Sequence, residues 1–105
     1  MRELQTQVAQ AADRLGLHAT APILVLGLLT DVGRLSDEAL AGTSFGRRPF
    51  RPTDGWAQRL ADAAFTLINL ADQTGVDLDY ELRTALSRYA QQFAQTSRPA
   101  DDLPF

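Results

Sequence analysis

The chain of 105 residues contains no cysteine. Disulfide bonds, thiolate metal sites and cysteine nucleophiles are therefore excluded. Because structural disulfides belong to oxidising compartments, this composition suits an intracellular protein, and we expect a cytoplasmic location.

The sequence also lacks a hydrophobic run long enough for a membrane helix. Its longest apolar stretch, Ala21 to Leu29, includes Pro22 and has nine residues, whereas a helix needs about twenty to span a bilayer. The first residues, Met1 to Gln5, hold no apolar core of the kind that a signal peptide needs. We therefore predict that no membrane is among the partners of this protein.

Positive charge is not in excess either. The chain has 10 basic against 13 acidic side chains, and the sequence pI is near 4.9. This balance argues against nucleic-acid binding driven by bulk electrostatics. The length allows a single domain, and a domain of this size buries only about two-thirds of its unfolded surface. A self-associating face would be a natural supplement to such a small core.

What the sequence does contain is helical spacing. Hydrophobic periodicity and punctuation by glycine and proline predict four helices, over about 2–15, 21–41, 55–74 and 78–94. Thr20, Asp54 and Asp77 are the expected N-caps of the last three, because their side-chain oxygens can accept bonds from free backbone amides. We predict an all-α fold, a four-helix bundle over residues 1–94, followed by a flexible C-terminal tail over residues 95–105.

One stretch of the second predicted helix has no polar side. The residues from Ile23 to Leu29 are apolar all round, so we expect them to be buried all round. A four-helix monomer of this size covers only part of such a segment. We therefore predict a homodimer or a higher homo-oligomer.

Two lines of polar residues interrupt the apolar helices. On the second helix, Asp31, Arg34 and either Asp37 or Glu38 follow at steps of three or four and share one face. The line on the third helix comprises Arg59, Asp62, Thr66, Asn69 and Gln73. If the two helices are antiparallel, Asp31 should lie close to Asp62. The alternative interpretation is that both lines face water, as charged residues usually do.

The segments that carry these lines resemble the MazG-type nucleotide pyrophosphohydrolases. Residues 29–37 (LTDVGRLSD) are similar to the family's EExxE segment, and residues 59–62 (RLAD) to its ExxD motif. Residues 67–78 (LINLADQTGVDL) continue the family pattern. The resemblance covers about residues 3–93, and its most specific part is 60–78.

The resemblance implies a helical bundle that assembles as dimers or tetramers. In the family, facing helices supply acidic ligands for Mg²⁺, which activates water to cleave a nucleoside triphosphate into monophosphate and pyrophosphate. Hard divalent cations prefer several oxygen ligands, and a polyphosphate needs its charge neutralised. For an active enzyme, the resemblance thus implies a nucleotide ligand and Mg²⁺ or Mn²⁺ as cofactor.

The chain departs from the family at most of the metal positions. The family's acidic positions are occupied here by Thr30, Asp31, Arg34, Arg59 and Asp62, of which only Asp62 keeps the family residue. A guanidinium has no acceptor with which to bind a cation. Two aspartates and two arginines also leave these positions neutral without metal. We therefore predict that the fold is kept, that the metal chemistry is lost and that no cofactor is bound.

An active site with shifted ligands remains open as an alternative. The shifted set comprises Asp31, Asp37, Glu38 and Asp62. The family's fourth helix commonly carries a lysine, an asparagine and an arginine that hold the substrate. The corresponding positions here are Ala85, Tyr89 and Gln92, which lack those groups.

The predicted loop over 42–53 holds three arginines among aromatic residues. Arg47, Arg48 and Arg51 are candidate contacts for a phosphate or an acidic partner, because arginine offers forked donors and stacks on rings. Trp56 is a candidate for stacking on a nucleotide base. The alternatives are a solvated loop with anchoring phenylalanines and a tryptophan used in the core or in a subunit contact.

Three functions from different classes follow from these observations. The first is a catalytically impaired MazG-like protein that acts as an oligomeric binding or regulatory module. The second is an active nucleoside triphosphate pyrophosphohydrolase with a reduced or shifted metal site. The third is a helical interaction module unrelated to nucleotides. Arg34 and Arg59 favour the first function over the second, and the long match over 60–78 disfavours the third.

Overall fold

The computed structural model describes residues 1–17 and 19–96, and the regular structure of this part of the chain is entirely helical. Its four helices are α1 (Arg2–Leu15), α2 (Ala21–Gly42), α3 (Trp56–Gln73) and α4 (Leu78–Thr96). The predicted all-α class is confirmed, and each helix ends within two residues of the expected position. Of the predicted tail, the first two residues belong to α4, and residues 97–105 lie outside the described part.

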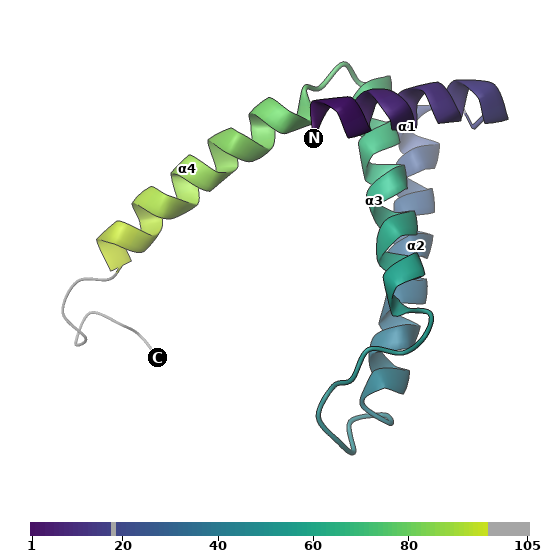
Figure 1. Cartoon of the computed structure of the whole chain (residues 1–105), viewed down its shortest axis with the longest axis vertical. Coiled ribbons are helices and arrows are strands. Elements are labelled where there is room, and N and C mark those ends of the chain that lie inside the picture. Colours follow the sequence, from purple (N-terminus) through teal and green to yellow (C-terminus); the bar gives the residue numbers. More distant parts are fainter. Residues whose placement is uncertain (18, 97–105) are drawn as a thin grey trace.

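Helices α2 and α3 form an antiparallel hairpin, and α1 lies across its end (Figure 1). The core is small and sits where these three helices meet. It consists of Val8, Ala12, Leu24, Ile68 and Ala71. None of the described helices combines the length and hydrophobicity that crossing a membrane requires.

The loop between α2 and α3 folds back on the end of α2. The Phe50 and Trp56 rings meet edge to face with centroids 5.0 Å apart. Phe50 also crosses Gly42 so closely that a Cβ there would lie 2.7 Å from the ring and 2.6 Å from the Arg51 carbonyl oxygen. Glycine is therefore required at this position for the loop to close.

The expected N-caps give three different outcomes. Asp77 caps α4 as predicted, because its Oδ1 accepts a bond from the Tyr80 amide at 3.1 Å. Thr20 stands at the start of α2 without a side-chain capping bond. The prediction for Asp54 was wrong, since the N-cap of α3 is Gly55 and no side chain caps it.

The Glu38 carboxylate of α2 lies beside Gly55, at the start of α3. A negative charge at a helix N-terminus is favourable.

Helix α4 departs from the other three. It contacts α1 near its own beginning and then extends away from the α2–α3 hairpin (Figure 1). Within one chain, therefore, α4 does not run beside α2 and α3 as the predicted four-helix bundle requires.

The apolar stretch of α2 is not covered by the other described residues of the same chain. We expected burial on all sides, but Ile23, Leu26 and Leu29 are 56, 60 and 68% exposed. Only Leu24 of this stretch is buried, because α2 packs on α3 with a single face.

Candidate functional site

The two polar lines meet between α2 and α3. The Thr66 hydroxyl donates a hydrogen bond of 2.6 Å to the Asp31 carboxylate, which is half-buried. Thr66 follows Asp62 by one turn of α3, a rise of about 6 Å. The antiparallel hairpin thus places Asp31 against the stretch of α3 that carries the second motif.

Asp62 has a positive neighbour on its own helix. Its carboxylate lies 3.8 Å from Nη1 of Arg59, in an i,i+3 pair whose side chains are partly exposed. Such a pair contributes at most about 1 kcal/mol to stability. Its consequence for the site is electrostatic, because the positive charge of Arg59 beside Asp62 opposes the approach of a cation.

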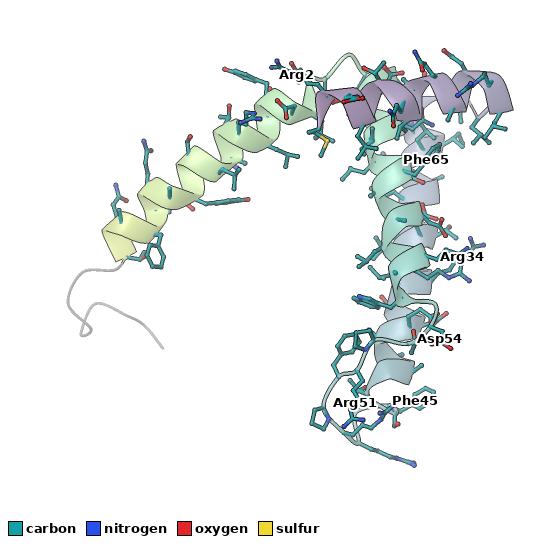
Figure 2. The ribbon with its side chains drawn as sticks, viewed as in Figure 1. Arg2, Arg34, Phe45, Arg51, Asp54 and Phe65 are labelled. Atoms are coloured by element: carbon teal, nitrogen blue, oxygen red, sulfur yellow. The ribbon has the colours of Figure 1, made fainter. Side chains whose placement is uncertain are left out.

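Arg34 does not join the two carboxylates. It is exposed on the surface of α2 (Figure 2) and forms no ion pair with any residue that the structure describes. The predicted pairing of two arginines with two aspartates is therefore present only for Arg59 and Asp62.

Glu38 has a structural role away from Asp31. It follows Asp31 by seven residues, about 10 Å along the helix axis, and its Oε1 accepts a bond of 2.7 Å from the Thr53 hydroxyl. Asp37 is exposed. Within residues 1–17 and 19–96, no three acidic or histidine side chains are grouped so that they could hold a metal ion. The shifted ligand set is thus not assembled within this part of a single chain.

Two further polar residues near the site bond to backbone carbonyl groups. The Thr30 hydroxyl donates to the Leu26 carbonyl oxygen, within the same helix, at 3.3 Å. Asn69 is only 2% exposed, and its amide donates to the Leu17 carbonyl oxygen at 3.2 Å. Asn69 therefore ties α3 to the segment that follows α1.

The arginine-rich loop presents its charges to solvent. Ser44 and Phe45 adopt left-handed backbone angles, with φ of 49° and 60°. Phe45 is exposed, and both Phe45 and Arg51 belong to the end of the hairpin where α2 connects to α3 (Figure 2). Arg48 donates a bond of 2.7 Å to the Ser44 hydroxyl, and Arg47 is exposed. Trp56, by contrast, is half-buried against Phe50, a packing position rather than an open stacking surface.

The three positions that the resemblance predicts for substrate contacts all lie on α4. Because α4 extends away from the hairpin, Ala85, Tyr89 and Gln92 do not face Asp31 and Asp62 of the same chain. Tyr89 is exposed and carries the Arg88 guanidinium over its ring at 5.2 Å.

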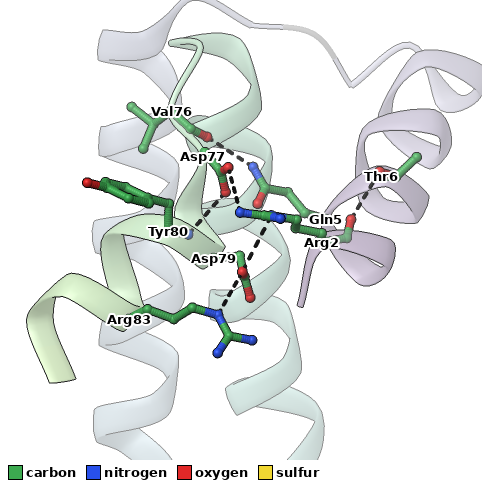
Figure 3. A network of polar contacts seen from close by, with 8 residues as sticks. All are labelled: Arg2, Gln5, Thr6, Val76, Asp77, Asp79, Tyr80 and Arg83. Carbon is green, nitrogen blue, oxygen red and sulfur yellow. Dashed lines mark hydrogen bonds and ion pairs between the residues drawn. The ribbon is translucent and has the colours of Figure 1, made fainter. Parts of the chain in front are cut away.

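Sequence reasoning missed a network that joins α1 to α4 (Figure 3). Arg2 lies 3.4 Å from the Asp77 carboxylate and 3.5 Å from that of Asp79. Arg83 donates a bond of 3.0 Å to Asp79, which is buried. The i,i+4 spacing of Asp79 and Arg83 was a signal for their pair. Nothing in the sequence indicated Arg2, because the contact joins segments more than seventy residues apart.

The network also changes the acidity of Asp79. The hydrogen bond from Arg83 lowers the pKa of this carboxyl below its ordinary value, and the positive charges of Arg83, Arg2 and the N-terminus act in the same direction. Burial opposes these effects. The ionised form is therefore the one that holds the first turn of α4 against α1.

Replacing Asp79 by asparagine should loosen α4 and lower the melting temperature. Because the folded-state pKa is lowered, the carboxylate contributes its full stability above the ordinary aspartate pKa and loses it as the pH falls through the lowered value. Melting curves across the acidic range should therefore fall less steeply for Asp79→Asn than for the natural chain. An Asp37→Asn control, at an exposed carboxylate, should keep the natural pH dependence. Parallel pH profiles for all three proteins would contradict this role of Asp79.

Comparisons with protein-family models, with curated proteins and with solved structures found no match. The resemblance to the MazG-type enzymes therefore rests on the motif residues themselves.

Proposed function

We propose that this chain is a MazG-like helical module that self-associates and binds or regulates a partner, without metal-dependent hydrolysis. The observation that carries the proposal is the state of the acidic side chains at the motif positions. Asp31 accepts a bond from Thr66, and Asp62 lies beside the Arg59 guanidinium. A hydroxyl donor thus bonds to one of these carboxylates and a positive charge lies beside the other, and both oppose the binding of a cation.

The positions that correspond to substrate contacts support the same proposal. A triphosphate needs positive or hydrogen-bonding groups around it, and the family uses lysine, asparagine and arginine there. This chain has Ala85, Tyr89 and Gln92, on a helix that extends away from the motif residues. A cytoplasmic location is part of the proposal, since a cysteine-free chain suits a reducing compartment.

A test of this proposal is to add Mg²⁺ or Mn²⁺ to the natural protein. A ligand that binds only the folded state stabilises it by RT ln(1 + [L]/Kd), about 2.7 kcal/mol at a hundredfold excess over Kd. We expect millimolar metal to leave the melting temperature unchanged and a panel of nucleoside triphosphates to release no pyrophosphate. A metal-dependent rise together with pyrophosphate release would instead support an active hydrolase that uses Asp31, Asp37, Glu38 and Asp62.

A helical interaction module unrelated to nucleotides is the second candidate. The exposed apolar surface of α2 and α4 favours it, because such surface needs a partner but does not require a nucleotide. Isothermal titration with nucleoside mono- and triphosphates separates the two candidates. Nucleotide binding supports the MazG-like module, and its absence in a protein that still self-associates supports the unrelated module.

A further inference from the structure

Helix α4 exposes a continuous apolar stripe. The α4 stripe consists of Leu82, Leu86, Tyr89 and Phe93, which are 43, 66, 58 and 72% exposed. Steps of four, three and four residues place them on one side of the helix, in the spacing of a coiled-coil seam. An isolated helix shorter than about 12–15 residues is marginal in water, and even longer ones depend on tertiary packing of an apolar face. The 19 residues of α4 therefore need a surface to pack against.

Helix α2 carries a second apolar stripe. The α2 stripe consists of Val25, Leu26, Leu29 and Val32, all exposed. Val25, Leu29 and Val32 follow at steps of four and three, on the side of α2 that does not face α3. Together with Leu28, the stripe lines a hollow of about 280 Å³. A hollow of this size can receive a leucine or an aromatic side chain of another helix.

The chain exposes more surface than a compact protein of its mass. Its accessible surface is 7880 Å², whereas about 5,800 Å² is expected for a compact monomer of 11.5 kDa. The radius of gyration is 17.7 Å, against about 13 Å for a compact domain of this length. The excess of about 2,000 Å² is larger than the roughly 800 Å² per partner that a stable interface buries. A second copy of the chain can therefore account for the covering that both stripes lack.

The α4 stripe is held away from the α2 stripe of its own chain. Arg2 pairs with Asp77 and Asp79 at the first turn of α4, and Gln5 donates a bond of 3.0 Å to the Val76 carbonyl oxygen just before it. These contacts fix the direction in which α4 leaves α1 (Figure 3). In the chain, α3 lies between α2 and α4, and α4 has no extensive contact with α2.

We infer that the α4 stripe of each chain packs on the α2 stripe of a second copy, so that the two chains exchange their α4 helices. We call this arrangement the arm exchange. A twofold axis relates the two contacts, so that both stripes of both chains are covered at once. This inference rests on the proposed self-association and specifies which surfaces form it. The occupant is a second copy because each chain supplies both halves of the contact in matching spacing.

The absence of cysteine allows a direct cross-linking test. One protein carries Leu29→Cys in the α2 stripe, and a second, with a larger tag, carries Leu86→Cys in the α4 stripe. After mixing and mild oxidation, we expect a mixed disulfide between the tagged and untagged chains, because a disulfide forms when the two Cα atoms are within about 7 Å. The matched controls are Arg34→Cys on α2 and Gln91→Cys on α4, which follow Leu29 and Leu86 by five residues each and so lie about 140° around their helices from these leucines.

The outcomes separate this inference from the proposed function. Cross-links of Leu86→Cys only with itself, or equal cross-linking of the two control positions, would overturn the arm exchange. A chain with both Leu29→Cys and Leu86→Cys that closes a disulfide as a monomer would show that α4 folds back on its own α2, which also overturns it. If sedimentation shows a dimer without the expected cross-link, the exchange is wrong and the self-association stands. If the natural chain is a monomer, the self-association in the proposed function fails as well.

Discussion

Replacing Leu86 and Phe93 together by aspartate should dissociate the assembly into monomers. Full burial of a large apolar side chain stabilises by about 1.5–3 kcal/mol, and twofold symmetry makes each substitution count twice. Four lost contacts weaken association by about 6 kcal/mol or more, and each 1.4 kcal/mol is tenfold in Kd. We expect the dissociation constant to rise by at least about a thousandfold, even if burial in the interface is incomplete.

The same variant should also lose part of its helical signal. Without a surface to pack on, α4 becomes an isolated helix, and such helices are marginally stable in water. Sedimentation velocity and far-ultraviolet circular dichroism measure the two effects. The matched control replaces Ser87 and Gln91 by aspartate, which adds equal charge on the opposite face of α4. Dissociation of the control, or a double variant that sediments like the natural chain, would contradict the role of the α4 stripe.

The second large effect is expected when Arg34 and Arg59 are both replaced by glutamate. The summed formal charge of the four positions Asp31, Arg34, Arg59 and Asp62 then changes from 0 to −4. Loss of the Arg59–Asp62 pair and the added repulsion should destabilise the metal-free protein by about 1–3 kcal/mol. A protein of this length then melts lower by roughly 5–15 °C.

Divalent metal should restore part of that stability. Four carboxylates in this region provide the oxygen ligands that Mg²⁺ and Mn²⁺ prefer. Hydrolysis should not return, because Ala85, Tyr89 and Gln92 still lack the groups that hold a triphosphate. The matched control replaces both arginines by glutamine, which removes the positive charges without adding ligands. The charge account fails if millimolar Mg²⁺ raises the melting temperature of the glutamine variant as much as that of the glutamate variant.

The positions of the helices could be predicted because their signals are local. Apolar periodicity and glycine after the last turn act within a few residues, and the Asp77 cap also depends only on the residues that follow it. The acidic group beside the start of α3 could not be predicted in this way. Glu38 brings its carboxylate to the start of α3 from another helix, so Asp54 is not needed there.

The direction of α4 could not be predicted from these local signals. It depends on contacts of Arg2 with Asp77 and Asp79, which follow Arg2 by more than seventy residues. Periodicity predicts an apolar side on α4 but not the surface that covers it. The same apolar stripe is needed whether α4 packs on its own chain or on a second chain. The sequence alone therefore does not distinguish these two arrangements.

The candidate site was predictable in its outline. Steps of three and four residues placed Asp31 on the face of α2 that meets α3, and the Thr66 bond is a consequence of that placement. The same spacing suggested that Arg34 shares this face, but the structure leaves it exposed. Asn69 shared the polar line of α3 in the sequence, yet it is buried and bonds to Leu17. Its partner belongs to the connection after α1, which periodicity does not place.

One chain leaves the apolar stripes of α2 and α4 exposed, and we expect a second copy to cover them. Sedimentation equilibrium of the natural protein at tens of micromolar measures whether it does. The expected mass is at least twice the chain's 11.5 kDa, unchanged when Mg²⁺ is added or removed. A single species with the mass of one chain would show that no second copy covers the stripes.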